Sequence, residues 1–312
     1  MAIKKSTRKA DPQRSRAKRR IAYVLVDVFT QRALEGNQLP VFTDARELTD
    51  DEMQALARET NLSETTFILP RAVEIEREQG VKVRIFTTTE ELSFAGHPTL
   101  GTATVLRSMR KKQADEIVLD LRAGKIPVKF TPGEGSLSFG EMRQRDPVAG
   151  MMHNREKIAQ ITGLKVEDFD PQLPIQTFST GLDFAVVPLR SLKVMRSLRF
   201  TWSSVAEYLS RSDAKFLYFV TRETVNPKAR LNARMIFYTA EDPATGSAAG
   251  CTAAWMVRYG VAQSDEAVMI GQGLEIKRPS EIYVRASLRG DKIDNVRVGG
   301  YCVEMARGEV IL

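Results

Sequence analysis

The chain has 312 residues, 43% of them hydrophobic, which is long for one domain and enough for two that each bury a core. No apolar run approaches the roughly 18 residues that a membrane span needs, and no signal-peptide pattern follows the basic start, so we expect a cytoplasmic protein with no membrane partner. Two cysteines without a CxxC pair and two histidines exclude a disulfide scaffold, a zinc site of that kind and a histidine-rich metal centre.

The net charge of +7 is concentrated at the start of the chain. Residues 1–20 hold nine Lys or Arg and one Asp, a net charge of +8, so the rest of the chain sums to −1. The low apolar content of this segment predicts a disordered basic tail over residues 1–20. Contact of the tail with nucleic acid or an anionic membrane is the alternative. Because no nucleic-acid-binding motif occurs elsewhere, we expect no specific nucleic-acid partner.

The first half of the folded part alternates strands with two helices. A helix is predicted over 50–60, where acidic residues occupy the first turn and apolar residues stand at 53, 56 and 57, and another over 98–109. Apolar and β-branched runs predict strands at IAYVLVDVFT (21–30), QLPVFT (38–43), NLSETTFIL (61–69) and VKVRIFTTT (81–89), and three short ones within 116–142.

The second half follows a similar order. Strands are predicted at FAVVPL (184–189), KFLYFVT (215–221), LNARMIFYT (231–239), LEIKRP (274–279), EIYVRA (281–286), NVRVGGYCVEM (295–305) and EVIL (309–312). Helices are predicted at SSVAEYLSR (203–211) and over 244–260, where small residues are frequent. One long helix among many strands in each half predicts the α+β class, with a curled sheet wrapped around a central helix in each half.

An alignment on Gly96 and Gly246 indicates that the two halves are copies of one unit. The pairs that share a spacing from these glycines are Arg84 and Arg234, Thr89 and Thr239, Glu91 and Glu241, and the Thr-Ala pairs at 102–103 and 252–253. Chance similarity between two strand–turn–helix units is the alternative. The shared order of strand, acidic loop, glycine turn and helix favours a repeat of two pseudosymmetric domains.

The two glycine turns, SFAGHPTLGT (93–102) and AEDPATGSAA (240–249), each place a glycine before a short polar residue at a helix start. The first N–H groups of a helix lack partners there and favour an anion. Either turn alone is no more than a well-capped helix start. Two such turns facing one cleft predict a site for a carboxylate or an enolate-like anion.

Several polar side chains near these turns are candidates for proton transfer. Glu64 lies in a predicted strand, where it either faces solvent or, in a dry cleft, has a raised pKa that suits general acid/base catalysis. Asp242 is either an acid at a helix start or a residue that holds a neighbour in position. His97 is a better functional candidate than most lone histidines because it follows a glycine at a helix start. Ser247 can cap its helix or bind a ligand, and Cys251, among small residues, is interpreted as a packed helix residue.

Six motifs resemble, in order, those of the PhzF-like family of phenazine-biosynthesis isomerases and their relatives. They are VDVFT, GNQLPVF, NLSETTF, RIFTTTEELSFAGHPTLGTA, EDPATGSAAG and GQGLEIKRPSEIYV, and the resemblance runs from about residue 22 to the C-terminus. It implies two domains of diaminopimelate-epimerase type, with mostly antiparallel curved sheets and the active site between them. We place these domains at 21–125, to which strands near 295–312 return, and at 126–294. The resemblance also implies a homodimer that uses no cofactor or metal.

The same resemblance implies roles for individual residues. The residues on the family's catalytic motifs are Glu64, His97, Asp242 and Ser247. Glu64 would shuttle a proton between carbons of a small carboxylate substrate such as a dihydro-hydroxyanthranilate, and the other three would assist. Gly96 and Gly246 would offer backbone N–H groups to the substrate carboxylate.

The chain departs from the family pattern at two positions, and two other functions are possible alternatives to the isomerase. Gln38 stands where relatives commonly have the proline of GNP, and Ala95 where many have a cysteine before Gly-His. Related racemases and epimerases carry a cysteine at the tip of each turn. Here His97 and Ser247 occupy the tips, which disfavours two-cysteine racemisation because an unactivated serine is a weak acid and base. Amino-acid racemase or epimerase and non-catalytic binding protein are the alternatives to the isomerase.

Overall fold

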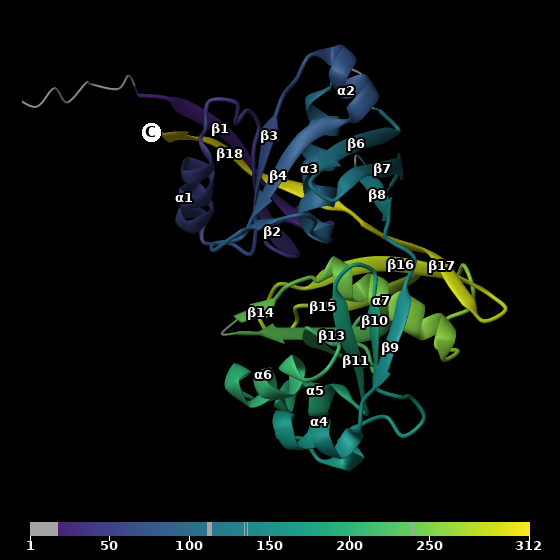
Figure 1. Ribbon diagram of the computed structural model, residues 1–312. Coiled ribbons are helices and arrows are strands. Elements are labelled where there is room, and N and C mark those ends of the chain that lie inside the picture. Colours follow the sequence, from purple (N-terminus) through teal and green to yellow (C-terminus); the bar gives the residue numbers. More distant parts are fainter. Residues whose placement is uncertain (1–17, 111–113, 134, 136, 239) are drawn as a thin grey trace, which may run out of the picture.

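The computed structural model describes residues 18–110, 114–133, 135, 137–238 and 240–312. The chain forms two halves, one above the other in Figure 1, and each half wraps a curved sheet around one long helix. The α+β class and the two pseudosymmetric halves predicted from the sequence are confirmed. No helix within the described ranges is both long enough and apolar enough to cross a membrane.

The elements of the first half begin at Arg20. They are β1 (Arg20–Val28), β2 (Asn37–Phe42), α1 (Asp50–Thr60), β3 (Thr65–Leu69), α2 (Val73–Gln79), β4 (Val81–Phe86), β5 (Glu91–Leu92), α3 (Gly96–Met109), β6 (Glu116–Leu121), β7 (Gly124–Pro132) and β8 (Ser138–Arg143). Residues 1–17 of the predicted basic tail lie outside the described residues. Arg20 pairs with Ile311 in the sheet, so β1 begins within the segment predicted to be a disordered tail.

The second half carries three further helices on its outer side. Its elements are β9 (Val148–Met152), α4 (Arg155–Thr162), a 3₁₀ turn (Val166–Asp168), β10 (Gln176–Ser179), β11 (Asp183–Leu189), α5 (Leu192–Ser197), α6 (Trp202–Ser210), β12 (Phe216–Thr221), β13 (Ala229–Phe237), β14 (Ala240–Asp242), α7 (Gly246–Arg258), β15 (Val268–Gln272), β16 (Ser280–Arg289), β17 (Lys292–Gly300) and β18 (Cys302–Ile311).

The strand pairings show that the halves are copies of one unit. In the first half β1–β2 is antiparallel, β2–β3 parallel, β3–β4 antiparallel, β4–β6 parallel, and β6–β7 and β7–β8 antiparallel. The pairs β10–β11, β11–β12, β12–β13, β13–β15, β15–β16 and β16–β17 repeat this pattern. Arg84 is paired with Glu91, and Arg234 with Glu241, at the same place in each copy. These two ion pairs account for the spacing that the sequence repeats.

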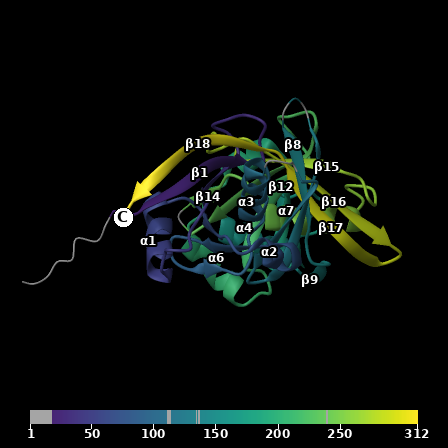
Figure 2. The ribbon, with the colours of Figure 1, turned by 90° about the horizontal axis from the view of Figure 1, so that it is seen from above.

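The strand that follows each repeated unit pairs with the other unit. After β8 the chain crosses over, and β9 pairs with β10. After β17 it returns, and β18 pairs along the whole of β1. Strands β8 and β17 pair with each other where the halves meet. Figures 1 and 2 show β18, in yellow, running beside β1 at the edge of the first half. The predicted boundary at 125/126 falls inside β7, across which the sheet is continuous.

The long helices are buried on nearly all sides. In α3 every residue from Gly96 to Ala103 is buried, and in α7 so is every residue from Ala248 to Val257. A Cβ at Gly101 would overlap Leu39 and Val28, so small residues allow the sheet to curl closely around the helix. A helix that is apolar all round belongs inside a core, which explains why both helices could be identified from small and apolar residues alone.

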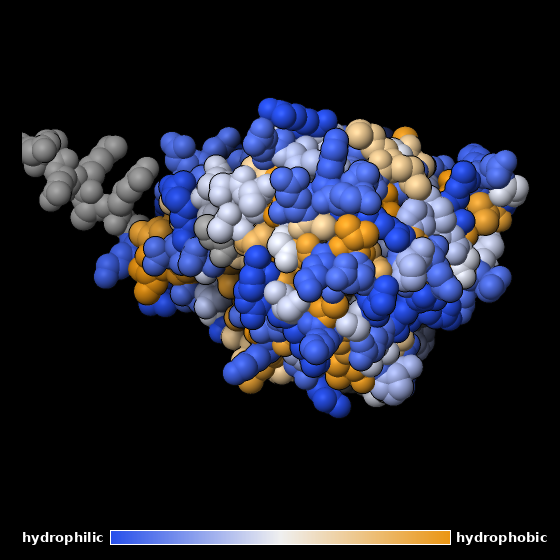
Figure 3. Space-filling view, turned by 90° about the horizontal axis from the view of Figure 1, so that it is seen from below, coloured by the Kyte–Doolittle hydropathy of each residue, from blue (hydrophilic) through white to orange (hydrophobic). Residues whose placement is uncertain are grey.

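Alternate residues of the second sheet face two different layers. Val186 and Val220 face the core that contains α7, whereas Val187 and Phe219 face a second core with residues of α4, α5 and α6. These three helices turn their polar residues outward, and hydrophilic residues cover most of the face seen from below in Figure 3. They therefore act as an outer layer of the second half.

Two strand predictions are corrected. LEIKRP (274–279) forms a turn, in which Lys277 has a φ of 60° and the Arg278 N–H donates to Gly273 O at 2.9 Å. The Arg278 guanidinium then reaches Asp27 at 2.6 Å, across the junction of the halves. The strand predicted over 61–69 covers only Thr65–Leu69, because α1 ends with Asn61 in a left-handed conformation and residues 62–63 form a bend.

Candidate active site between the two halves

The two glycine turns of the sequence meet at the junction of the halves. A Cβ added to Gly96 would lie 3.3 Å from Gly246 Cα, and one added to Gly246 would lie 3.2 Å from Phe29 Cζ. No other residue type fits this contact without displacing a neighbour. The N-termini of α3 and α7 therefore converge, and the positive ends of two helix dipoles share one region.

The first N–H groups of both helices are free of side-chain caps. The residues that precede the helices, Ala95 and Thr245, make no side-chain hydrogen bond to the helix N–H groups. Ser247 lies inside the first turn of α7, so of the two roles considered for it, capping the helix is excluded and binding a ligand stays open. Uncapped N–H groups at two converging N-termini can bind an anion such as a carboxylate.

Glu64 lies just before β3 and points toward His97. Its Oε2 is 3.5 Å from His97 Nε2, and 17% of its side chain is exposed. Burial, with a smaller contribution from the negative charge of Asp242, raises the pKa of Glu64 to about 8. A carboxyl group with such a pKa can both accept and donate a proton near neutral pH.

His97 is the second residue of α3 and is held as a neutral imidazole. Its side chain is 5% exposed, and burial lowers its pKa to about 3 despite an opposing hydrogen bond with the backbone of Gln38. His97 Nε2 is buried and has no hydrogen-bond partner among the described residues. With so low a pKa, His97 does not take the proton from Glu64, and it lies beside that carboxyl group as a neutral polar side chain.

Asp242 ends β14, on the opposite half from Glu64. Its Oδ2 accepts a hydrogen bond from Thr245 Oγ1 at 2.7 Å, and its Oδ1 accepts one from Asn37 Nδ2 at 2.8 Å. Burial raises the pKa of Asp242 to about 6, although these hydrogen bonds act in the opposite direction. The structure thus brings Glu64, His97 and Asp242 together from three separate segments.

Asn37 joins the two halves at this site and was missed by the sequence analysis. It is 2% exposed, and its Nδ2 lies 2.8 Å from Asp242 Oδ1, 3.0 Å from Ala244 O and 3.3 Å from His97 Nδ1. The signal that could have found it is a polar residue at the first position of the apolar strand β2, in the GNQ motif. Of the residues in this motif, only Gln38 was considered from the sequence.

Gln272 fixes the backbone at Asp242 through hydrogen bonds. Its Nε2 donates to Asp242 O at 2.8 Å and to Thr245 Oγ1 at 3.0 Å. Its Oε1 accepts from Thr245 N at 3.1 Å and from Tyr218 O–H at 2.8 Å. All four hydrogen-bonding positions of this buried amide are used, so the turn from Asp242 to Thr245 has a fixed shape.

The cysteines take no part in the proton-transfer cluster. Cys251 is fully buried within α7, which confirms its interpretation as a packed residue. Burial raises the pKa of Cys251 and of Cys302 to about 12, so both are thiols at neutral pH. Within the described ranges, no three His, Cys, Asp or Glu side chains are grouped so that they could hold a metal ion.

Comparisons with known proteins identify the family. Residues 26–308 match the model of the family described as phenazine biosynthesis-like protein, PhzC-PhzF. The chain is 33% identical to a trans-2,3-dihydro-3-hydroxyanthranilate isomerase of Pseudomonas chlororaphis, over 93% of this chain and 99% of that one. A crystal structure of a PhzF-family protein of Bacillus anthracis superposes with a TM-score of 0.82 at 26% identity, covering 94% and 100% of the two chains.

A second solved structure carries a different description. It is a predicted epimerase from Pseudomonas aeruginosa, with a TM-score of 0.79 at 32% identity, covering 93% of this chain and 99% of that one. The match of fold and sequence extends over both halves and includes the junction where the three titratable side chains meet. The chain belongs to the phenazine biosynthesis-like PhzC-PhzF family and is an isomerase.

Proposed function

We propose that the chain shuttles a proton between two carbons of a small cyclic carboxylate of the dihydro-hydroxyanthranilate type, with Glu64 as the proton carrier. The observation that carries this proposal is the 3.5 Å approach of the Glu64 carboxyl group to the neutral His97, beside two converging helix N-termini. The relatives named trans-2,3-dihydro-3-hydroxyanthranilate isomerases support the substrate class.

In the proposed mechanism, the N–H groups at Gly96 and Gly246 bind the substrate carboxylate. The ionised Glu64 removes a proton from a carbon, and the electron pair of that C–H bond moves into the adjacent conjugated system. The protonated Glu64, whose side chain is 17% exposed and exchanges its proton with solvent, then delivers a proton to the carbon at the other end of that system. The composition of the substrate does not change, so the reaction needs no oxidant or reductant.

His97, Asp242 and Ser247 have supporting roles in this proposal. His97 and Asp242 stabilise or relay charge around Glu64, at the distances given above. Ser247, half-buried at the start of α7, donates a hydrogen bond to the substrate. The racemase alternative is not favoured, because the residues at the tips of the turns are His97 and Ser247 and both cysteines are buried thiols.

The test is a comparison of Glu64→Gln with Glu59→Gln, an exposed glutamate at the end of α1. Glu64→Gln should lower turnover of trans-2,3-dihydro-3-hydroxyanthranilate by about 10²–10⁴-fold and leave its affinity nearly unchanged. Glu59→Gln should behave like the native chain. Turnover by Glu64→Gln close to the native rate would refute the mechanism, and tight binding by the native chain without any turnover would favour the non-catalytic alternative.

Three predictions from the sequence remain proposals. They are the homodimer, the independence from cofactors and the cytoplasmic location. Sedimentation of the purified chain tests the first, and turnover after exhaustive dialysis against a chelator tests the second. Fractionation of cells that produce the full chain tests the third.

A further inference from the structure

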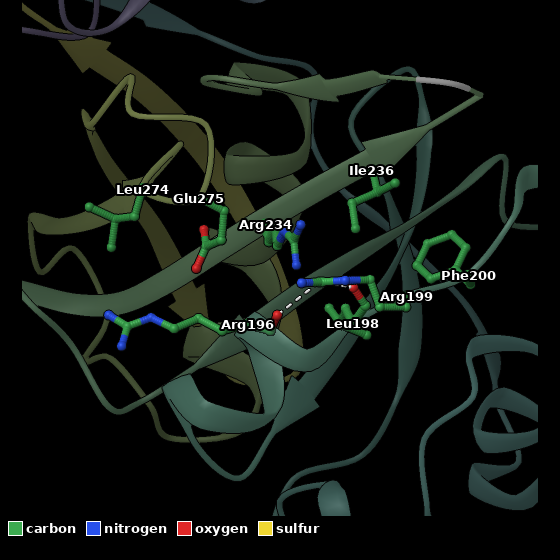
Figure 4. A pocket seen from close by; sticks show the side chains of 8 residues that line it. All are labelled: Arg196, Leu198, Arg199, Phe200, Arg234, Ile236, Leu274 and Glu275. Carbon is green, nitrogen blue, oxygen red and sulfur yellow. Dashed lines mark hydrogen bonds between the residues drawn. The ribbon is translucent and has the colours of Figure 1, made fainter.

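A second polar cavity lies on the second half, away from the cluster of Glu64, His97 and Asp242. Its volume is about 530 Å³, and it is bordered by α5, the segment that follows α5, β13 and the turn after β15. Figure 4 shows the eight residues that line it, Arg196, Leu198, Arg199, Phe200, Arg234, Ile236, Leu274 and Glu275. Three arginines and one glutamate thus face a space whose other walls are apolar.

The arginines differ in how their charges are balanced. Arg234 is 10% exposed at its side chain and is neutralised by Glu241 at 2.8 Å. Arg199 donates from its guanidinium to the carbonyl oxygens of Arg196 and Leu198, and Arg234 donates to that of Met195. Both guanidinium groups therefore bind the same turn and line the same wall. Within the described ranges, Arg196 and Arg199 have no carboxylate within ion-pair distance.

Glu275 adds a negatively charged hydrogen-bond acceptor to the pocket. Its Oε1 is buried and has no hydrogen-bond partner among the described residues. In Figure 4 its carboxylate points toward the space bordered by Arg196 and Arg234. Because Glu275 lines the cavity, its carboxylate group can accept a hydrogen bond from a ligand that carries a donor.

We propose that this cavity, the arginine pocket, binds a small aromatic carboxylate that also carries an amino or hydroxyl group. The carboxylate lies against Arg199 and Arg234, where guanidinium groups offer paired donors. The amino or hydroxyl group donates a hydrogen bond to the Glu275 carboxylate. The ring packs against Phe200 and Ile236, which form the apolar part of the wall.

The charges of the pocket select this class of ligand. Two unpaired guanidinium groups and one carboxylate leave one net positive charge, because Arg234 and Glu241 cancel. A ligand with one negative charge and a neutral donor matches that balance, whereas an anion without a donor, such as chloride or sulfate, leaves Glu275 without a donor and unfavourably close to a like charge. The pocket residues alone give this match, which does not depend on the function proposed for the other site.

The test measures binding of 4-aminobenzoate and of benzoate to the full chain by isothermal titration calorimetry. The native chain should bind 4-aminobenzoate more tightly than benzoate, and Arg199→Met should weaken the binding of both at least tenfold. Glu275→Gln should remove the preference for the amino compound. Arg211→Met is the matched control, since Arg211 is an exposed arginine paired with Glu207 on α6, and it should change neither affinity.

Arg234 is left in place because its partner Glu241 precedes Asp242, so its replacement would disturb both sites. Binding at the candidate active site would be insensitive to Arg199→Met and Glu275→Gln, which separates the two sites in the same titration. Native affinities in both variants, or no binding by the native chain at millimolar probe, would overturn the proposal. Either result leaves the Glu64 mechanism untouched.

Discussion

The amide of Asn37 donates a hydrogen bond of 2.8 Å to the carboxylate of Asp242, which lies in the other half of the chain. The same Nδ2 lies 3.3 Å from His97 Nδ1, so one side chain connects two candidate proton-transfer residues that belong to different halves. Because a charged acceptor strengthens a hydrogen bond, this contact favours the ionised form of Asp242.

Replacement of Asn37 by Ala should therefore raise the pKa of Asp242. Asp242 Oδ1 and Ala244 O lose their donor while buried, at a cost of about 1–3 kcal/mol in the free energy of unfolding. The pKa of Asp242 is followed by the NMR chemical shift of its carboxyl carbon against pH, and its midpoint should lie higher than in the native chain. An unchanged midpoint, in a variant that folds, would show that Asn37 does not favour the ionised form of Asp242.

Replacement of Arg234 by Met should destabilise the second half strongly. Arg234 and Glu241 are 10% and 9% exposed at their side chains, so the change leaves Glu241 as an uncompensated buried charge. We expect a loss of about 3–5 kcal/mol in the free energy of unfolding, measured by urea denaturation. Arg211→Met, which breaks an exposed ion pair, should cost less than about 1 kcal/mol. Equal losses in the two variants would contradict this account.

Replacement of Gly96 by Ala should push the two helix N-termini apart. The new Cβ would lie 3.3 Å from Gly246 Cα, and overpacking of this kind costs about 1–3 kcal/mol. Because the displaced N–H groups no longer converge, we expect weaker binding of the substrate carboxylate and a higher KM. Unchanged KM and stability would indicate that the close approach of the helices is not required.

The high pKa of Glu64 should make the protein less stable at alkaline pH. The folded state holds the proton up to about pH 8, whereas the unfolded chain releases it near pH 4.5. The stabilising effect of the proton is complete below pH 4.5 and is lost as the pH rises to about 8. Glu64→Gln should therefore be more stable than the native chain at pH 9, with little difference at pH 4. Parallel stability curves from pH 4 to pH 9 would show that Glu64 is not held protonated.

The repeat and the long helices could be predicted from the sequence because their signals are local. The Arg84 and Glu91 pair and its copy, Arg234 and Glu241, lie at one fixed spacing within a single hairpin. The helices that begin at Gly96 and Gly246 are continuous runs of small and apolar residues. Glu64 and Asp242 were selected from motifs, and the structure supplies the burial that gives them raised pKa values.

The features of the fold and the site that could not be predicted from the sequence depend on contacts between distant segments. The pairing of β18 with β1 joins residues from the two ends of the chain, and no local pattern in an edge strand specifies its partner. Asn37 acts on Asp242 over 205 residues, so its role appears only once the halves are in place. LEIKRP alternates like a strand, yet it turns because Arg278 donates from its backbone to Gly273 and from its guanidinium to Asp27.

The most direct test of Glu64 as the proton carrier is deuterium incorporation during turnover. Trans-2,3-dihydro-3-hydroxyanthranilate is incubated in D₂O with the native chain, Glu64→Gln or Glu59→Gln, and carbon-bound deuterium is followed by NMR. We predict that the native chain and Glu59→Gln place deuterium on carbon as the substrate isomerises, whereas Glu64→Gln does so about 10²–10⁴-fold more slowly. Incorporation by Glu64→Gln at the native rate would contradict the account.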